Sequence, residues 1–393
     1  MHLSTSAPTP FTAQGRLIDF MREAGEPGLI NFAAGVPGLD SLPTEELEKA
    51  FASAFEGGGA AVFAYQHPEG DLRLRDLLAE RLRKRGAAIE GRQIVCCTGC
   101  TQALQVMLTV LLQPGDIVAC EAPAYYGMLE LLSQAGARVL PVPVRGPDGI
   151  DLAETEALLK QWKPRCLIVC TALSNPSGAT VPEANREKLV ELCRENGVRL
   201  IEDDIYGELV DGGAPTSLLA YDPSGATVSY VSSFSKSVSP GLRAGVCVPG
   251  TLHEDFATRK CQQDLHSATV TEAGLREFLA AGRLDPHLET LRVRNRRRRE
   301  LAMGAIRRSF PKDARFVEPR GGYMLWVELA ENIDLKPVRE EARKERIVFA
   351  SGDVFFVRPT ERACLRLNCA KASEEELVRG LEILGGILCA QAE

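Results

Sequence analysis

Seven short runs of β-branched and apolar residues alternate with amphipathic helical patterns through the middle of this 393-residue chain. The runs occupy residues 94–98, 117–121, 139–144, 166–171, 198–203, 228–233 and 244–248. Helical patterns fill the gaps, and the pattern at 183–196 follows Pro182 and stops before Gly197, which are ordinary start and stop signals. Strands that alternate with helices pack as a sheet with helices on its faces. The sequence therefore predicts an α/β fold with a mostly parallel seven-stranded sheet.

The seventh run and everything after it follow a different pattern. Only a short loop precedes residues 244–248, which is too little for a helical crossover, so we expect this strand to be antiparallel. Beyond residue 285, a long charged helix (288–309), two strands (323–328 and 364–368) and a closing helix (373–388) are typical of a smaller α+β domain. We expect an N-terminal segment at 1–45 that contributes to the small domain, a large domain at 46–283, and a C-terminal small domain at 284–393.

Charge and hydropathy narrow the class of partner. The formal net charge of −7 and the isoelectric point near 5.5 argue against nucleic acid, which needs a basic surface. Arg294 and the four arginines at 296–299 are the local exception, and a solvated helix face explains them better than a polyanion site. The first residues lack a secretory signal, and no apolar run approaches the length of a membrane span. We expect small-molecule partners and no membrane.

Twelve cysteines raise the question of a metal site or disulfides. Cys96, Cys97 and Cys100 cluster, yet no second Cys or His pair follows at the spacing of a zinc finger. Most of the others lie in apolar runs, where a thiol acts as a small core residue. Buried, reduced cysteines without a metal are therefore expected, and they indicate a cytoplasmic protein.

The sharpest local signal is SSFSKSVSPGLRAG at 232–245, where a lysine follows the end of a predicted buried strand. A lysine that attacks an aldehyde needs partial desolvation, because only the neutral amine is nucleophilic. The hydroxyls of Ser233 and Ser235 and the guanidinium of Arg243 suit a phosphate dianion. The segment therefore predicts a phosphorylated aldehyde bound at Lys236. The alternative is a serine-rich loop with two incidental cations.

Three weaker segments accompany it. IEDDIYGEL (201–209) brings carboxylates to the end of a strand, and Asp204 could pair with a ring nitrogen, or the loop could simply cap a helix. SNPSG (174–178) is a turn whose Asn175 amide could donate to a ring oxygen. CTGCTQAL (97–104) is a strand, a glycine and a helix start, which together form an anion site. Taken alone, SNPSG is more simply explained as a turn, CTGCTQAL is a weak pattern, and IEDDIYGEL fits the two interpretations equally well.

In this order the four segments resemble fold-type I pyridoxal-5′-phosphate (PLP) enzymes, specifically class I/II aminotransferases. The chain is similar to the 2-aminoadipate aminotransferase branch and to the aminotransferase-like domain of MocR regulators. The resemblance also includes NFAAGVPGLDSLP (31–43), YQHPEGDLRLRDLLA (65–79) and LRLNCA (365–370). It implies the fold-type I architecture, PLP as cofactor and an enzyme of amino acid metabolism.

The resemblance implies a role for each matching position. Lys236 holds the cofactor as a Schiff base and shuttles the substrate proton, Asp204 pairs with the ring nitrogen, and Tyr206 completes the catalytic set. The implied cofactor-binding residues are Gly99, Cys100, Thr101, Tyr125, Asn175, Asp204, Tyr206, Ser233, Ser235, Lys236 and Arg243, with Tyr65 reaching in from the partner subunit of a homodimer. The implied substrate-binding residues are Arg366, which grips the α-carboxylate, with Asn175 and Gly35.

Two features depart from the resemblance, and three functions remain open. Cys100 and Thr101 stand where the family often has Ser or Ala followed by Gln. Ile18 stands where related aminoadipate enzymes carry an arginine, and Arg16 or Arg22 are the nearby substitutes. Transamination between an L-amino acid and a 2-oxo acid is the leading hypothesis. The alternatives are PLP-dependent elimination, replacement or cyclisation in specialised metabolism, and the ligand-sensing domain of a regulator.

Overall fold

A computed structural model describes residues 7–12, 15–24, 26–330, 333–358 and 363–392 of the chain. Its largest element is an eight-stranded sheet in which each of the seven predicted runs forms a strand. In spatial order the strands are β1 (Thr9–Pro10), β5 (Arg138–Pro143), β4 (Ile117–Ala122), β6 (Cys166–Val169), β7 (Arg199–Asp203), β8 (Val228–Ser233), β9 (Gly245–Val248) and β3 (Val95–Cys97). The predicted α/β class is confirmed, and the eighth strand is the short β1 at one edge.

Strand direction brings one end of several strands together. Strands β5, β4, β6, β7 and β8 are parallel to one another. Strand β9 runs antiparallel to both β8 and β3, as the short loop before it predicted. The carboxyl ends of β4, β6, β7 and β8 therefore open at the same edge of the sheet, which is where open α/β sheets bind ligands.

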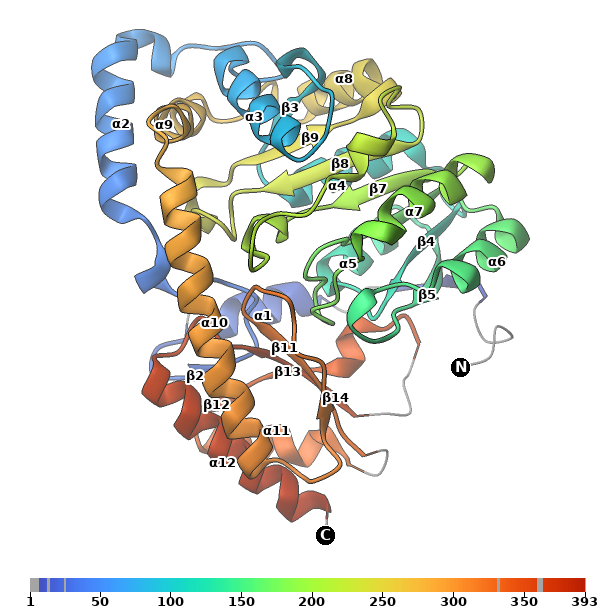
Figure 1. The fold of residues 1–393 in the computed structure, drawn as a ribbon, viewed down its shortest axis with the longest axis vertical. Coiled ribbons are helices and arrows are strands. Elements are labelled where there is room, and N and C mark those ends of the chain that lie inside the picture. The colour runs from blue at the N-terminus through green and yellow to red at the C-terminus, as the bar shows by residue number, and fades with distance from the viewer. Residues whose placement is uncertain (1–6, 13–14, 25, 331–332, 359–362, 393) are drawn as a thin grey trace.

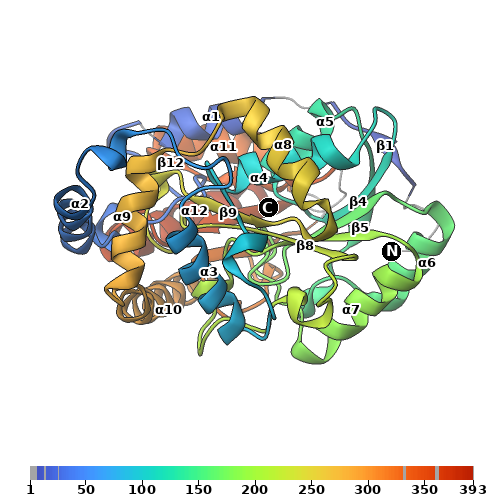
Figure 2. The same cartoon turned by 90° about the horizontal axis from the view of Figure 1, so that it is seen from above.

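Helices cover both faces of this sheet (Figures 1 and 2). Helices α3 (Leu72–Lys84), α6 (Leu152–Trp162) and α7 (Glu183–Glu195) pack against one face, and α4 (Cys100–Leu111), α5 (Tyr126–Gln134) and α8 (His253–Asp264) pack against the other. On β6 the consecutive residues Leu167 and Ile168 point to opposite faces and belong to different core clusters. The strands are apolar on both sides because both sides are covered.

A second, smaller layer contains the C-terminal helix and part of the N-terminal segment (Figure 1). Its antiparallel sheet has the order β10 (Arg315–Phe316), β11 (Met324–Glu328), β14 (Cys364–Asn368), β13 (Ala350–Ser351). Strand β2 (Ile30–Asn31) pairs in parallel with β12 (Ile347–Val348), so the N-terminal segment joins this layer. The remaining helices are α1 (Arg16–Ala24), α2 (Thr44–Gly58), α9 (Thr269–Ala280), α10 (Leu284–Ser309), α11 (Leu335–Lys344) and α12 (Glu374–Ala392). The domain boundaries at residues 45 and 283 stay a prediction.

The arginines of α10 correct one expectation. Arg298 and Arg299 are buried, whereas a solvated face was predicted for the whole run. Arg298 Nη2 donates to Asp40 Oδ2 at 3.0 Å, and Arg299 Nη1 donates to the Gly322 carbonyl at 2.6 Å. The amphipathic pattern missed this because both guanidiniums bind groups from distant segments. In the residues that the structure describes, no helix is both long and apolar enough to cross a bilayer.

Candidate active site

A pocket of about 400 Å³ lies at the carboxyl ends of β6, β7 and β8. Part of its wall comes from the N-terminal segment and from α1, so it is shared between the two layers. The predicted site residues that line it are Gly35, Cys100, Thr101, Tyr125, Asn175, Tyr206, Ser233, Ser235, Lys236 and Arg243. The fold thus brings into one cavity residues that span two hundred positions of sequence.

Lys236 follows β8 and projects into this pocket. Its Nζ donates a hydrogen bond of 2.6 Å to the carbonyl oxygen of Gly35. Burial, together with the positive charges of Arg366 and Arg243, lowers the pKa of Lys236 to about 8. Because the shift favours the neutral form, the amine is available as a nucleophile or base much closer to neutral pH than an ordinary lysine.

The structure contradicts the prediction for Asp204. Successive strand residues point to opposite faces. Glu202 and Asp204 point away from the pocket, where Asp204 Oδ2 pairs with Arg85 and accepts the Tyr230 hydroxyl proton at 2.8 Å. Asp203, between them, lines the pocket. We therefore propose that Asp203 takes the role first given to Asp204.

Asp203 has the environment of a functional carboxylate. Burial raises its pKa to about 6, so it is ionised at neutral pH but at an energetic cost. The thiol of Cys100 donates to Asp203 Oδ1 over 3.6 Å, and this hydrogen bond opposes the rise. Cys100 was predicted to belong to an anion site, and in the structure its side chain instead supports Asp203. A buried, weakly compensated carboxylate is suited to pairing with a protonated ring nitrogen.

An anion cradle lies at the end of the pocket near α4. Helix α4 begins without a side-chain cap, so its first N–H groups and the positive end of its dipole face outward. Ser233 and Ser235 lie 2.9 Å apart by their Oγ atoms, and Arg243 Nη1 donates to Ser235 Oγ at 3.1 Å. Two hydroxyls, a guanidinium and a helix start are the donors that a phosphate dianion requires.

Gly99 makes the cradle sterically possible. Its φ of +84° lies in the left-handed region, and a Cβ at this position would lie 2.4 Å from Arg243 Nη2. Arg243 also adopts a positive φ, of 48°, which is uncommon for a residue with a side chain. The backbone is thus held in an unfavourable conformation where the cradle needs it, and strain of this kind clusters at binding sites.

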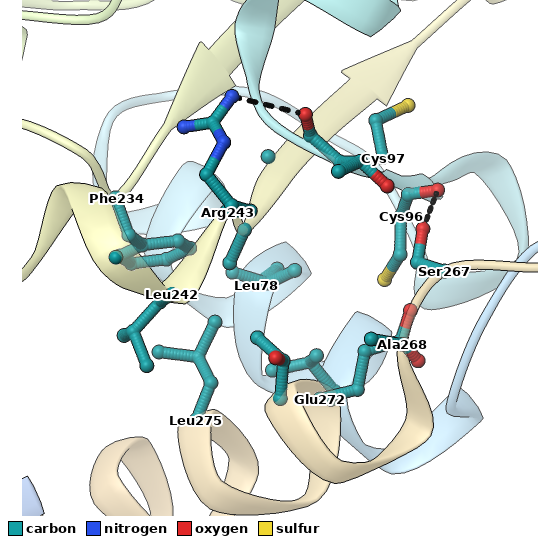
Figure 3. A pocket seen from close by; sticks show the side chains of 16 residues that line it. Leu78, Cys96, Cys97, Phe234, Leu242, Arg243, Ser267, Ala268, Glu272 and Leu275 are labelled. Carbon is teal, nitrogen blue, oxygen red and sulfur yellow. Dashed lines mark hydrogen bonds between the residues drawn. The ribbon is translucent and has the colours of Figure 1, made fainter.

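Arg243 also lines a second cavity of about 280 Å³ on its other side (Figure 3). There its Nη2 donates to the Thr98 carbonyl at 3.2 Å, and Leu78 and Leu275 form an apolar wall. Arg243 is the one predicted site residue among those that line this cavity in the described chain. The hydrogen bonds to Thr98 and Ser235 fix the guanidinium between the two cavities.

Three polar side chains surround the middle of the pocket. Burial raises the pKa of the Tyr125 and Tyr206 phenols well above the ordinary value, so both remain proton donors. A Cβ on Gly127 would lie 2.6 Å from the Tyr125 ring, so glycine leaves room for that ring. Asn175 accepts a hydrogen bond from Arg366 through Oδ1, which orients its amide NH2 as the donor. These groups can hold a planar ring that carries an acidic oxygen.

Arg366 lies on β14 and is fully buried. Nη1 donates to Asn175 Oδ1 at 2.9 Å, Nη2 donates to the Ala33 carbonyl, and Nε has no partner among the described residues. The guanidinium carbon lies 5.6 Å from the Tyr126 ring centre and 5.0 Å from that of Phe355. A rigid, desolvated guanidinium of this kind suits a carboxylate.

Besides Asp204 and Gly99, two predicted site residues do not line the pocket: Arg366 and Tyr65. Arg366 is not part of the pocket wall itself, but it approaches it at Gly35, where a Cβ would lie 3.6 Å from Arg366 Nη1. Tyr65 is 85% exposed and packs edge-on against His266, outside the pocket. Tyr65 was predicted to reach the cofactor in the partner subunit of a homodimer, and this stays a prediction.

Sequence reasoning missed several pocket residues. Besides Asp203, the main polar one is Glu121, near the end of β4, whose Oε1 accepts the Ser174 hydroxyl proton at 2.8 Å. Burial raises the pKa of Glu121 to about 8. Its place at the carboxyl end of a parallel strand was the available signal. Leu17 and Met21 of α1 also line the pocket and were missed, because their role depends on where α1 packs.

The structure also places Ile18 and Arg22, which were considered at the position where related enzymes carry an arginine. Ile18 itself is exposed, and neither it nor Arg22 lines the pocket. The side chain of Arg16 lies outside the described residues. Cys96, Cys97 and Cys100 are buried, as expected.

Known proteins resemble the chain over nearly its whole length. The family model for aminotransferase class I and II matches residues 27–384. The 2-aminoadipate transaminase of Thermus thermophilus is 32% identical over 94% of this chain and 92% of that protein. An uncharacterised HTH-type transcriptional regulator of Escherichia coli, YjiR, is 28% identical over 96% of this chain and 80% of that protein. The crystal structure of LysN, an α-aminoadipate aminotransferase from T. thermophilus complexed with N-(5′-phosphopyridoxyl)-L-leucine, superimposes with a TM-score of 0.87 at 31% identity, covering 95% of both chains.

Proposed function

This chain belongs to the class I and II aminotransferases, and from that premise we propose that Lys236, Asp203 and Arg366 carry its amino-group transfer. The enzyme uses PLP and moves an amino group between an L-amino acid and a 2-oxo acid. The observation that carries the residue assignment is the desolvated Lys236 amine, which shares one pocket with an anion cradle and with Asp203.

The residues around the pocket fit PLP. Ser233, Ser235, Arg243 and the first turn of α4 would hold its phosphate, and Gly99 leaves the space for close approach. The groups proposed for the ring are Asp203 for its nitrogen, Asn175 and Tyr206 for its oxygen, and Tyr125 for its face. When bound, PLP supplies an aldehyde and an electron-withdrawing ring that stabilises negative charge at the substrate Cα.

The protein side chains supply orientation and proton transfer. Arg366 binds the α-carboxylate and so fixes the Cα–H bond relative to Lys236. Lys236 accepts the Cα proton, and in the half-reaction with the 2-oxo acid it returns a proton to Cα. Asp203, ionised above about pH 6, would keep the ring nitrogen of bound PLP protonated. The match to aminotransferases favours this outcome over elimination, replacement or cyclisation.

A homodimer is part of the proposal. Tyr65 is 85% exposed and Phe63 is 69% exposed, and Phe63 stacks on Phe55 at 5.8 Å between ring centres. Exposed aromatic side chains in one region are typical of an interface. Light scattering after size exclusion should give twice the chain mass, and Tyr65→Ala should weaken cofactor binding. The cytoplasmic location stays a prediction.

A single-turnover experiment tests the proposed reaction. Enzyme loaded with PLP should convert one equivalent of a reactive L-amino acid into its 2-oxo acid and leave the amino form of the cofactor, which a second 2-oxo acid reverses. Release of free ammonia together with an oxo acid would instead indicate elimination. Absence of cofactor absorbance after incubation with excess PLP would contradict the assignment altogether.

A further inference from the structure

Part of the pocket remains after the groups for the cofactor and the α-carboxylate are assigned. It lies where α1 packs against α5, and the contact is fixed by Glu130 Oε1, which accepts from the backbone N–H of Leu17 at 3.1 Å. Among the residues of α1, α4 and α5 that line the pocket, five have leucine or methionine side chains; they are Leu17, Met21, Leu104, Met128 and Leu131, which we call the apolar bay. In Figure 1, α1 lies between the two layers, below and to the left of α5.

The charged side chains of the pocket already have partners or assigned roles outside the apolar bay. Among the described residues that line it, Lys236 and Arg243 are the cations of Lys or Arg type, and Arg243 is bonded to Ser235 and Thr98. Asp203 and Glu121 are the acidic side chains. Arg366 is held by Asn175 and Ala33 and is positioned for one carboxylate. A second carboxylate on a substrate would find no free described cation in the apolar bay.

The bay has exposed apolar surface that a ligand can cover. Met21 is 58% exposed, and Leu17 is partly buried against the aromatic cluster that contains Tyr126 and Phe355. Arg22 and Asp19, the described charged residues of α1, do not line the pocket. Covering such a surface with an apolar group is favourable by about 25 cal/mol per Å², whereas placing an unpaired charge there is costly.

We propose that the apolar bay receives the substrate side chain, so that the enzyme selects L-amino acids with uncharged, apolar side chains over those with a distal carboxylate. The inference rests on the proposed function and names its substrate class. Because donor and acceptor use one site in turn, the preferred 2-oxo acids have apolar side chains too.

Matched pairs of substrates test the proposal. L-Norleucine and L-2-aminoadipate have side chains of the same length and differ in a terminal methyl or carboxylate group. In single-turnover reactions of the PLP-loaded enzyme we expect norleucine to react roughly 100-fold more efficiently. Equal or better reaction of 2-aminoadipate would overturn the proposal. If neither compound reacts, nor any other L-amino acid, the proposed function itself has failed.

Binding without reaction provides an independent measurement. Hexanoate and adipate are the corresponding mono- and dicarboxylate, and neither can be transaminated. Calorimetry on the loaded enzyme should give a Kd for hexanoate at least roughly tenfold lower than that for adipate. Tighter binding of adipate would overturn the proposal even if the kinetic preference were obscured by a slow later step.

Substitutions in α1 locate the effect. Met21→Arg should raise the efficiency with 2-aminoadipate about tenfold and lower it with norleucine, because a cation now lines the bay. Arg22→Gln is the matched control on the adjacent, exposed position and should change neither. Leu17→Ala shortens a side chain of the apolar bay without adding a charge. It should lower the efficiency with norleucine and leave the efficiency with 2-aminoadipate unchanged. Loss of 2-aminoadipate reactivity in Arg22→Gln or Arg16→Gln would show a cation that reads a distal carboxylate, against the proposal.

Discussion

Two adjacent aspartates at the end of β7 lie on opposite sides of the sheet and differ in how the protein pairs their carboxylates. Asp204 belongs to a buried polar network in which Arg85 and Tyr230 bind its Oδ2, while Glu202 on the same side binds Thr171 and Ser217. Asp203 faces the pocket, where its side chain accepts a weak hydrogen bond from the Cys100 thiol and one from the Ile205 backbone, and no arginine pairs with it among the described residues.

The difference separates a structural carboxylate from a functional one. A buried charge that the protein itself pairs is costly to disturb and holds the fold together. A buried charge that the protein leaves nearly unpaired keeps a shifted pKa and is available to a ligand. Burial alone therefore does not identify the catalytic aspartate, whereas the identity of its partners does.

The largest predicted effect concerns the lysine on the pocket side. Lys236→Ala should slow the half-reaction by about 10⁴-fold, the upper range for loss of a positioned proton-transfer group. The readout is single-turnover formation of the 2-oxo acid. Lys260→Met is the matched control, since Lys260 is also fully buried but pairs with Asp264 outside the pocket. An equal loss of rate in both variants would mean that the effect is structural.

Next in size is the effect of replacing either aspartate. Asp203→Asn should lower the rate on the order of 10²–10³-fold with little change in stability, because it removes a ligand partner. Asp204→Asn should lower the free energy of unfolding by about 3 kcal/mol, because Arg85 loses its partner, while the rate per folded molecule changes little. Urea denaturation and single-turnover kinetics measure the two quantities. If Asp204→Asn loses activity while its stability is intact, the comparison between the two faces is wrong.

Arg366→Lys tests whether the guanidinium is needed as such. Lysine keeps the charge but cannot make the paired hydrogen bonds, so the KM for amino acids should rise roughly 30-fold, about 2 kcal/mol. The cofactor affinity should change less than the KM, because Arg366 is assigned to the substrate and affects the cofactor only through Asn175. A variant that binds PLP poorly but keeps its KM would reassign Arg366 to the cofactor.

The smallest effect concerns Cys100 and is seen in the pH profile. Asp203 is ionised above its pKa of about 6, so activity should be present above that pH and lost below it. The Cys100 thiol lowers this pKa, so Cys100→Ala should move the acid limb of the profile to higher pH. At pH 8 the rate should change by less than about tenfold, as for loss of one weak hydrogen bond. Cys100→Ser keeps a donor and should restore the wild-type limb.

Much of the fold could be predicted because its signals are local. Each predicted run became a strand, and the short loop before 244–248 correctly gave an antiparallel direction. The prediction of a solvated face for the arginines of α10 was wrong at Arg298 and Arg299, because these side chains bind carbonyls and carboxylates that are distant in sequence. Periodicity reports the face of a helix but not what that face meets.

The site was predictable where one segment contained the whole signal. Lys236, Ser233, Ser235 and Arg243 lie within eleven residues and do share the pocket wall. The error of one position at Asp204 arose because strand phase was not applied: Glu202 and Asp204 share a side, which leaves Asp203 on the other. The apolar bay could not be predicted, since it requires α1 to pack against α5, across more than one hundred residues.

Borohydride reduction of the PLP-loaded enzyme, followed by peptide mass mapping, tests the central claim most directly. The account predicts a phosphopyridoxyl mass on the peptide that contains Lys236, at close to one per chain, and no such mass after prior removal of the cofactor. Labelling of another lysine such as Lys260 in place of Lys236, or no stable label at all, would contradict it.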